Sequence, residues 1–196
     1  MKTIIEATLA ESIAVKRQFI ADSTSTIISI SQRIADAMVS GHKVLLFGNG
    51  GSAADAQHIA AEFVNRFAIE RPPLAAIALT TDTSILTSIG NDYSFEEIFS
   101  KQIRALGRKD DVAVGISTSG NSPNVIAAMT AAAEIGMTTI GFSGARGRLP
   151  EVSDICMKVS SKTTARIQEC HILAAHIICD LVDRILFPKA YVEGAS

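Results

Sequence analysis

The sequence predicts a three-layer α/β fold, in which helices cover both faces of a five-stranded parallel sheet. Five short apolar runs have the pattern of strands that are buried on both faces, and they occupy residues 44–47, 74–79, 112–116, 138–142 and 155–159. Helical patterns separate most of these runs, and such alternation is typical of a doubly wound sheet. A long helical pattern precedes the first run, so we also expect an N-terminal helical extension.

The helical extension covers residues 3–40. Ile5, Leu9 and Ile13 recur near helical spacing, and a similar pattern continues to Met38. Asp22 and Ser23 offer an N-cap, which predicts a break there and a second helix after it. We assign the whole chain, 1–196, to one domain, with helices in 1–40 for oligomerisation and an α/β core in 41–188.

The remaining helices follow the strands in order. They are expected at 52–67, at 83–106 with an interruption at 90–92, at 123–135, and at 165–186 before Pro188. Connections in such sheets are right-handed crossovers. Because ligands of these folds bind beyond the carboxyl ends of the strands, we look for chemistry in the loops that follow the apolar runs.

Composition excludes several classes of protein. The net charge is −2 without a basic run, which argues against nucleic-acid binding. Every apolar run is much shorter than the ~20 residues that a membrane span needs. The first twelve residues include two glutamates, where a signal peptide needs an apolar core, and the chain has an odd number of cysteines, three. We therefore expect a cytoplasmic protein without disulfides, whose low charged fraction of 19% favours contacts between subunits.

Two loops at strand ends have features of phosphate-binding sites. The first strand runs into Gly48-Asn49-Gly50-Gly51-Ser52, where a helix begins and its free N–H groups favour an anion or a polyhydroxylated ligand. The third strand runs into Ser117-Thr118-Ser119-Gly120-Asn121-Ser122-Pro123, whose hydroxyls and amides suit phosphate oxygens. Either loop alone is also compatible with an ordinary turn, but two on one sheet favour a ligand.

The first loop also matches the dinucleotide fingerprint, since Gly48, Gly50 and Ala53 have its spacing. That fingerprint needs an acidic residue after the second strand, and Asp82 is the candidate. Asp82 is equally suited to cap the next helix. A nucleotide-binding oxidoreductase therefore stays an alternative, in which the hydroxyl loop has no role.

Two helices carry the ionisable residues that favour a metal or acid–base site. His58 and Glu62 are four apart and share one helix face, which is the spacing of paired metal ligands. Gln168 and His176 lie two turns apart on the last helix. These four groups would converge on one divalent ion if the helices cross. The alternatives are a solvated His58–Glu62 pair and a core His176; His171 is interpreted as structural.

The sequence resembles the phosphoheptose isomerases of the sugar-isomerase (SIS) domain group over essentially its whole length. The similar segments are GNGGSAADAQHIAAEF (48–63), GNDYSFEEIF (90–99), GISTSGNSPNV (115–125) and ARIQECHILAAHIICDLVD (165–183). The hydroxyl loop is common to many SIS functions. The combination of His58, Glu62 and the segment from Arg166 to His176 is more specific to the isomerases.

The resemblance implies an aldose–ketose isomerase that converts sedoheptulose 7-phosphate into D-glycero-D-manno-heptose 7-phosphate for bacterial lipopolysaccharide, through an enediol. It implies Glu62 and His176 as the acid–base pair, and one Zn²⁺ held by His58, Glu62, Gln168 and His176. The implied substrate contacts are Asn49, Gly50, Gly51, Ser52, Glu62, Asn91, Asp92, Ser117, Thr118, Ser119, Ser122 and Gln168. It also implies a homotetramer whose sites lie at subunit interfaces.

Two further alternatives stay open within the same fold. A non-catalytic sugar-phosphate-binding protein or a replication-initiation regulator would keep the scaffold without needing the acid–base pair. An isomerase for a pentose or hexose phosphate would differ in the length of its pocket. The joint presence of Glu62, Gln168 and His176 favours an enzyme over the regulator.

Overall fold

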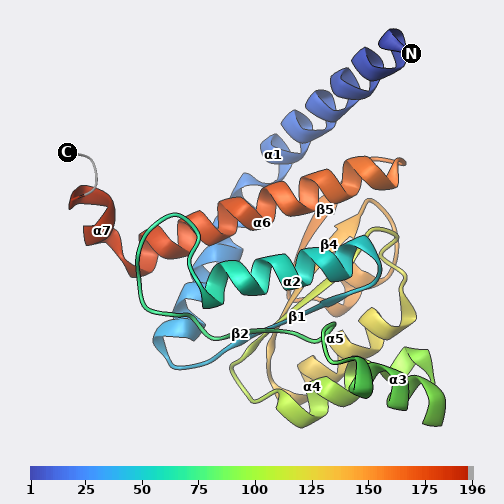
Figure 1. Ribbon diagram of the computed structural model, residues 1–196, viewed down its shortest axis with the longest axis vertical. Helices are drawn as coiled ribbons and strands as arrows, with labels where there is room; N and C mark the ends of the chain where they lie inside the picture. Colours follow the sequence, from blue (N-terminus) through green and yellow to red (C-terminus); the bar gives the residue numbers. More distant parts are fainter. Residues whose placement is uncertain (194–196) are drawn as a thin grey trace.

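The computed structural model describes residues 1–193 and contains the predicted parallel sheet with helices on both faces (Figure 1). Its five strands are arranged in the order β2-β1-β3-β4-β5, and every neighbouring pair is parallel. The strands are β1 (Val44–Gly48), β2 (Ala76–Ala78), β3 (Val112–Ser117), β4 (Thr138–Gly144) and β5 (Ile155–Val159). The fold class predicted from the sequence is therefore confirmed.

Helices form the two outer layers. They are α1 (Lys2–Val39), α2 (Gly51–Val64), α3 (Thr83–Asp92), α4 (Ser100–Leu106), α5 (Pro123–Ile135), α6 (Thr164–Leu186) and α7 (Pro188–Glu193), with short 3₁₀ turns η1 (Phe95–Glu97) and η2 (Leu149–Val152). Successive side chains of β1 point to opposite faces of the sheet and so contribute to two separate hydrophobic clusters. Val44 and Leu46 pack with α1, α2 and α6, whereas Leu45 and Phe47 pack with α4 and α5.

The N-terminal segment differs from the prediction, because α1 is one continuous helix through Asp22 and Ser23. Asp22 accepts a hydrogen bond from the Gln18 side chain one turn earlier instead of capping a new helix. Phe19 and Ile27, on either side of the expected break, are buried in the same core cluster. The burial of both side chains on one continuous helix stabilises α1 more than a helix break capped at Asp22 would.

The ends of two other helices also differ from the sequence prediction. The helix α2 ends at Val64 because Arg71 donates hydrogen bonds to the carbonyl oxygens of Glu62, Phe63 and Asn65, which would otherwise be left without partners. The expected interruption at 90–92 instead falls after Asp92, since these residues form the last turn of α3.

Local sequence signals explain how α3 and α5 begin and end. Pro123 occupies the first turn of α5, and Gly136 ends it in the left-handed conformation at φ 86°. Asp82 caps α3 by accepting a hydrogen bond of 2.9 Å from the Ile85 N–H. The capping role of Asp82 removes the support that the dinucleotide alternative had drawn from it.

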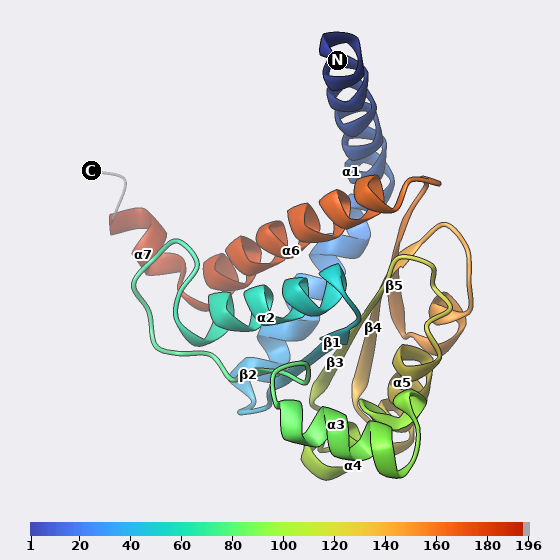
Figure 2. The ribbon, with the colours of Figure 1, turned by 45° about the vertical axis from the view of Figure 1, so that its right-hand side comes forward.

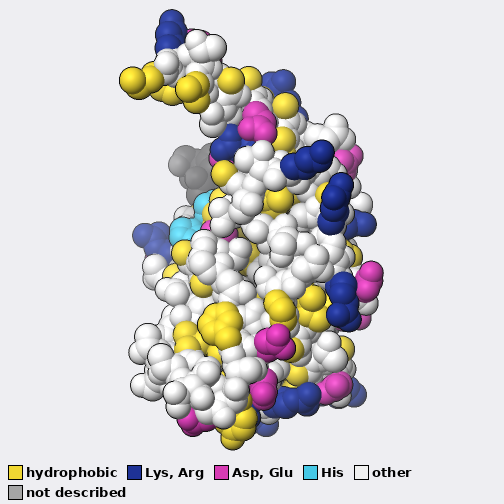
Figure 3. All heavy atoms as spheres, turned by 90° about the vertical axis from the view of Figure 1, so that its right-hand side faces the viewer, with side chains coloured by type: hydrophobic (Ala, Val, Ile, Leu, Met, Phe, Trp, Pro, Cys, Tyr) yellow, Lys and Arg dark blue, Asp and Glu magenta, His cyan; other side chains and the backbone are white. Residues whose placement is uncertain are grey.

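The N-terminal half of α1 projects from the body of the molecule (Figures 1 and 2). Hydrophobic side chains lie along this projection (Figure 3), and Ile4, Ile5, Leu9 and Ile13 are exposed. Within residues 1–193, every helix is too short or too polar to cross a lipid bilayer. The three cysteines are free thiols, as the sequence predicts.

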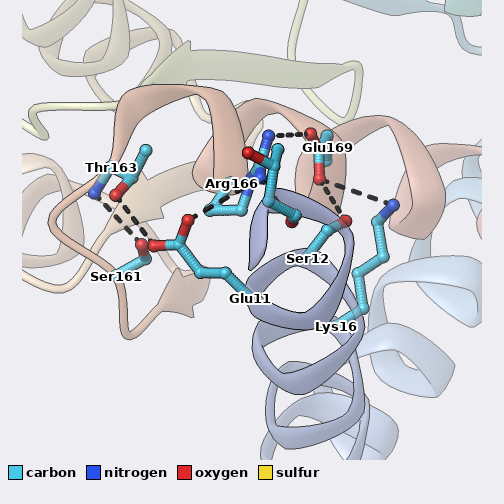
Figure 4. Close-up of polar contacts among 8 residues, drawn as sticks. Glu11, Ser12, Lys16, Ser161, Thr163, Arg166 and Glu169 are labelled. Atoms are coloured by element: carbon cyan, nitrogen blue, oxygen red, sulfur yellow. Dashed lines mark hydrogen bonds and ion pairs between the residues drawn. The ribbon is translucent and has the colours of Figure 1, made fainter. Parts of the chain in front are cut away.

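Polar contacts fix the base of the projection to α6 (Figure 4). The Ser12 hydroxyl donates a 2.6 Å hydrogen bond to Glu169, and Lys16 forms an ion pair with the same carboxylate. Arg166 donates to the backbone carbonyl of Thr8 and also contacts Glu169. These contacts set the direction in which α1 leaves the α/β core.

Candidate active site

The hydroxyl loop follows β3, as the sequence predicts. The Ser117 hydroxyl lies 3.3 Å from that of Ser119 and 2.9 Å from that of Ser122, which is the N-cap residue of α5. Ser122 makes no side-chain capping bond, so the hydroxyls gather beside the free N–H groups of a helix N-terminus. The arrangement suits the oxygens of an anion.

The glycine loop after β1 lies beside the hydroxyl loop. Gly50 has a φ of 55°, which suits glycine and lets the chain turn directly into α2. Two side-chain hydrogen bonds, of 2.8 and 2.9 Å, join Asn49 to Asn124 in the first turn of α5. Ser52 is buried under the turn. The two predicted loops therefore form one continuous polar surface at the carboxyl edge of the sheet.

The helices α2 and α6 run side by side in the same direction, and this arrangement brings the ionisable residues together (Figures 1 and 2). Gln168 packs its amide against the backbone of Gly51, and a side chain at Gly51 would collide with it. Gln168 is also partly buried. It therefore joins α6 to the glycine loop.

His58, Glu62 and His176 meet two turns farther along the helices. The Nε2 atoms of His58 and His176 are 2.9 Å apart, and His58 Nε2 lies 3.2 Å from Glu62 Oε1. The ligand atoms of all three residues lie within 4.8 Å of one another. Two imidazoles and a carboxylate are a donor set typical of zinc. In a tetrahedral site with bonds of about 2.0–2.1 Å, two nitrogens would be roughly 3.3 Å apart, so the cluster fits an ion with little movement.

Asp55 belongs to the same face of α2 as His58, and the sequence interpretation missed it. Its Oδ2 atom is buried and has no hydrogen-bond partner among residues 1–193. Burial raises the pKa of this carboxyl above its ordinary value, while the nearby His58 and His176 act to lower it. Asp55 is three residues before His58, so helical spacing contained the signal that would have found it.

Asn91 and Asp92 are not brought to this cluster. They are exposed at the end of α3, where Asn91 donates a 2.8 Å hydrogen bond to Asp92. The helix α3 packs with the cluster of α4 and α5, on the opposite face of the sheet from α2 and α6. Within one chain, these two residues therefore lie apart from the imidazole–carboxylate group.

His171 is a structural residue, as interpreted from the sequence. Its ring is buried beside Phe142, and its Nε2 lies 3.1 Å from the Ser143 carbonyl oxygen. Burial lowers its pKa to about 4, and the hydrogen bond offsets only part of the effect. His171 is therefore neutral at ordinary pH.

Comparison with known proteins identifies the family. The SIS domain model matches residues 9–144. A phosphoheptose isomerase of Roseiflexus sp. is 57% identical over 91% of this chain and 91% of its own length. The structure of phosphoheptose isomerase from Neisseria gonorrhoeae is 46% identical, with a TM-score of 0.88 over 93% of this chain and 98% of that one.

A phosphoheptose isomerase from Francisella tularensis gives a similar result, with 38% identity and a TM-score of 0.90 over 93% of this chain and 97% of that one. The alignments with these three isomerases each cover more than nine-tenths of this chain, whereas the SIS domain model ends at residue 144, before α6. The chain is therefore an enzyme of the SIS-domain family and belongs, within it, to the phosphoheptose isomerases.

Proposed function

We propose that the enzyme converts sedoheptulose 7-phosphate into D-glycero-D-manno-heptose 7-phosphate. The observation that carries the proposal is the meeting of Glu62 with His58 and His176 between α2 and α6, beside a polar loop surface. The names of the similar proteins support the same substrate class. An aldose–ketose isomerisation needs a base that removes a proton from carbon and a group that transfers a proton between two oxygens. This cluster offers groups for both tasks.

In the proposed mechanism, Glu62 removes the proton from C1 of the ketose and returns it to C2 of the product. His176 donates a proton to O2 and accepts the proton from O1, so that the carbonyl moves to C1 through a cis-enediol. The Phe67 ring lies 5.7 Å from the His176 ring and limits how that imidazole turns. Positioned acid–base groups of this kind typically contribute about 10²–10⁴-fold in rate.

The same residues would hold a divalent ion, which we propose to be zinc. His58, Glu62 and His176 fit such an ion by their chemistry and spacing, and Gln168 is proposed as the fourth ligand. When bound, the ion would act as a Lewis acid toward the carbonyl group. Glu62 has two carboxylate oxygens, so one would serve as ligand while the other accepts the proton. His176 likewise has two ring nitrogens, so one would hold the ion while the other exchanges protons with the sugar oxygens.

The two loops supply the proposed substrate contacts. Asn49, Gly50, Gly51 and Ser52 would face the sugar hydroxyls together with Gln168 and Glu62. Ser117, Thr118, Ser119 and Ser122 would face the phosphate. Binding of the distant phosphate can orient the sugar for reaction at the other end of its chain.

We further propose a homotetramer whose sites are completed by neighbouring subunits. The exposed apolar residues of the projecting α1 support such an assembly. Asn91 and Asp92 lie on the opposite face of the sheet from the Glu62 cluster, so a neighbouring subunit would have to supply them to the site. No nucleic-acid or membrane partner is proposed. We expect the reaction to occur in the cytoplasm and to feed heptose synthesis for lipopolysaccharide.

A non-catalytic SIS protein that binds a sugar phosphate or regulates replication initiation is the second candidate. Such a protein would need the loop surface but not the imidazole–carboxylate cluster. The convergence of these three ionisable residues from two helices favours the enzyme.

The direct test is incubation of the protein with sedoheptulose 7-phosphate, followed by proton NMR with and without a chelator. We expect an aldose product that forms more slowly after chelation and recovers with added zinc. Binding of the sugar phosphate without any aldose product, in zinc-loaded protein, would favour the non-catalytic candidate.

A further inference from the structure

A cavity of about 700 Å³ opens beside the hydroxyl loop. Thr118 and Ser119 form one wall of it, and the loops that follow β4 and β5, together with the start of α6, form the rest. The lining residues are Thr118, Ser119, Ala145, Arg146, Ser160, Ser161, Lys162, Thr164 and Ile167. The lining contains hydroxyl groups and two cationic side chains but no acidic residue. Its chemistry is that of an anion site, and it adjoins the surface already assigned to the phosphate.

The two cations of the lining are available for a ligand. Arg146 and Lys162 are exposed, and neither has an ion-pair partner among residues 1–193. The carboxylate of Glu11 accepts a 3.1 Å hydrogen bond from Thr163, beside Lys162, and lies 3.7 Å from Arg166 (Figure 4). The recorded contacts of Glu11 are therefore with Thr163 and Arg166 at the start of α6, and it forms no ion pair with either lining cation.

Backbone contacts hold the Arg146 loop against the hydroxyl loop. The Leu149 N–H donates a 2.9 Å hydrogen bond to the Gly120 carbonyl, and the Arg148 N–H donates to the Asn121 side chain. A Cβ atom at Gly120 would collide with the Arg146 carbonyl oxygen, so the two loops are packed as closely as glycine allows. This docking keeps Arg146 at the edge of Ser119.

Lys162 approaches the cavity from the turn before α6. The Thr163 N–H donates to the Ser161 hydroxyl, and the Thr163 hydroxyl binds Glu11, so both residues beside Lys162 are held (Figure 4). Thr164 begins the 23-residue helix α6 at the cavity wall. The unpaired N–H groups of that first turn add positive potential on the side where Lys162 lies.

We propose that Arg146 and Lys162 are specificity-determining residues, which bind the phosphate dianion of the substrate where the cavity meets Ser119. This inference rests on the proposed function. Hydroxyls and amides of the hydroxyl loop can orient phosphate oxygens, but they supply no net charge. The two cations, from the loops that follow β4 and β5, supply it with charge-assisted hydrogen bonds that are stronger than those from neutral donors. Phosphorylated sugars are thereby selected over their neutral counterparts.

The test compares Arg146→Gln, Lys162→Gln and the double variant with Arg148→Gln as the matched control. Arg148 is an exposed arginine on the same loop that does not line the cavity. We expect the double variant to raise KM for sedoheptulose 7-phosphate about tenfold or more, with kcat within about twofold, and the control to match wild type. The KM of wild type should rise with salt more steeply than that of the double variant.

A titration with inorganic phosphate, followed by NMR of the backbone amides of the hydroxyl loop, separates this inference from the proposed reaction. We expect phosphate to shift the Ser119 and Gly120 amide signals in wild type and in Arg148→Gln, and much less in the double variant. If that pattern appears without isomerase activity, the anion site stands and the proposed reaction fails. Equal phosphate affinity in the double variant and the control, or an equal KM, would overturn the inference.

Discussion

At the scale of single residues, the His58–His176 contact determines what the site can do. With their Nε2 atoms 2.9 Å apart, one imidazole must donate the proton and the other must accept it. The lone pairs of the same two nitrogens, together with the carboxylate of Glu62, could bind a metal ion in place of this hydrogen bond.

The first prediction concerns metal content. Replacing His58 by Ala should lower bound zinc per chain by about tenfold or more, because one of the four proposed ligands is lost. Replacing His42 by Ala should leave zinc unchanged, since His42 precedes β1 and lies beside Asp111 instead. Atomic absorption after dialysis against a weak chelator measures the difference. Equal zinc in both variants would contradict the assignment of His58 as a ligand.

The second prediction concerns the pH dependence of stability. The pKa of His171 is lowered to about 4 by burial, so the unfolded chain takes up a proton at higher pH than the folded chain does. Stability from this residue is therefore complete above about pH 6.5 and is lost as the pH falls toward 4, by up to about 1.4 kcal/mol per pH unit.

Urea unfolding at about pH 7.5 and about pH 5.5, at fixed protein concentration, measures this loss. We expect His171→Gln, which retains a donor toward Ser143, to remove about 1 kcal/mol of the difference between the two conditions. An unchanged difference in the variant would mean that His171 is not the titrating group.

At the scale of elements, the parallel course of α2 and α6 builds the site. Their first turns meet at Gly51 and Gln168, and two turns later the same helices bring His58 to His176. The far ends are joined by Arg71, which contacts Asp183 of α6 at 2.9 Å and the last carbonyls of α2. The pairing of the helices is therefore fixed at both ends, with the ionisable cluster between them.

The third prediction concerns this buried ion pair. Arg71→Met should cost about 3–5 kcal/mol of stability, because it leaves Asp183 buried without its partner. Arg104→Met is the control, since Arg104 pairs with Glu134 on the surface and such pairs contribute about 0–1 kcal/mol. Denaturant unfolding of both variants gives the two values. A similar small loss in both would show that the Arg71 pair does not hold α2 to α6.

Elements with strong local signals could be predicted from the sequence. The strand β5 and the helix α5 have the predicted bounds, since a mostly apolar run at 155–159 and the Pro123–Gly136 pair mark them locally. The continuity of α1 could not be predicted, because its Asp22–Ser23 signal is local and the packing that overrides it is not. The contact of His58 with His176 spans 118 positions, so spacing alone left it open.

Other parts of the site were missed for similar reasons. Arg146 and Lys162 come from loops after different strands, and only the folded sheet edge places them around one cavity. Helical spacing could have placed Asp55 on the same helix face as His58, but nothing in the sequence indicates that its carboxylate is buried without a partner. The sequence thus located the loops and the helix faces, whereas the structure was needed to say which residues meet.

At the scale of the whole molecule, the projecting half of α1 is the feature that a single chain does not explain. Its Ile5, Leu9 and Ile13 remain exposed, although the base of the same helix is buried in the core. A helix with an apolar side facing water is typical of an interface. The fourth prediction therefore concerns assembly.

Replacing Leu9 and Ile13 together by Lys should prevent the tetramer from forming, because the charges would have to be buried between subunits. Ala7→Lys is the control, since Ala7 is exposed on another side of the same helix. Light scattering should give about four times the chain mass of 20.7 kDa for wild type and the control, and a smaller mass for the double variant. A wild-type mass of one chain would refute the assembly.

The central claim is that Glu62 transfers the proton between C1 and C2 of a sugar phosphate. The most direct measurement is the turnover of sedoheptulose 7-phosphate in D₂O by wild type and Glu62→Gln, followed by NMR. We expect wild type to form the aldose, with deuterium at C2 to the extent that the proton on Glu62 exchanges with solvent before it is returned, and Glu62→Gln to be at least about 100-fold slower while it still binds the substrate. Turnover by Glu62→Gln at the wild-type rate would contradict the account.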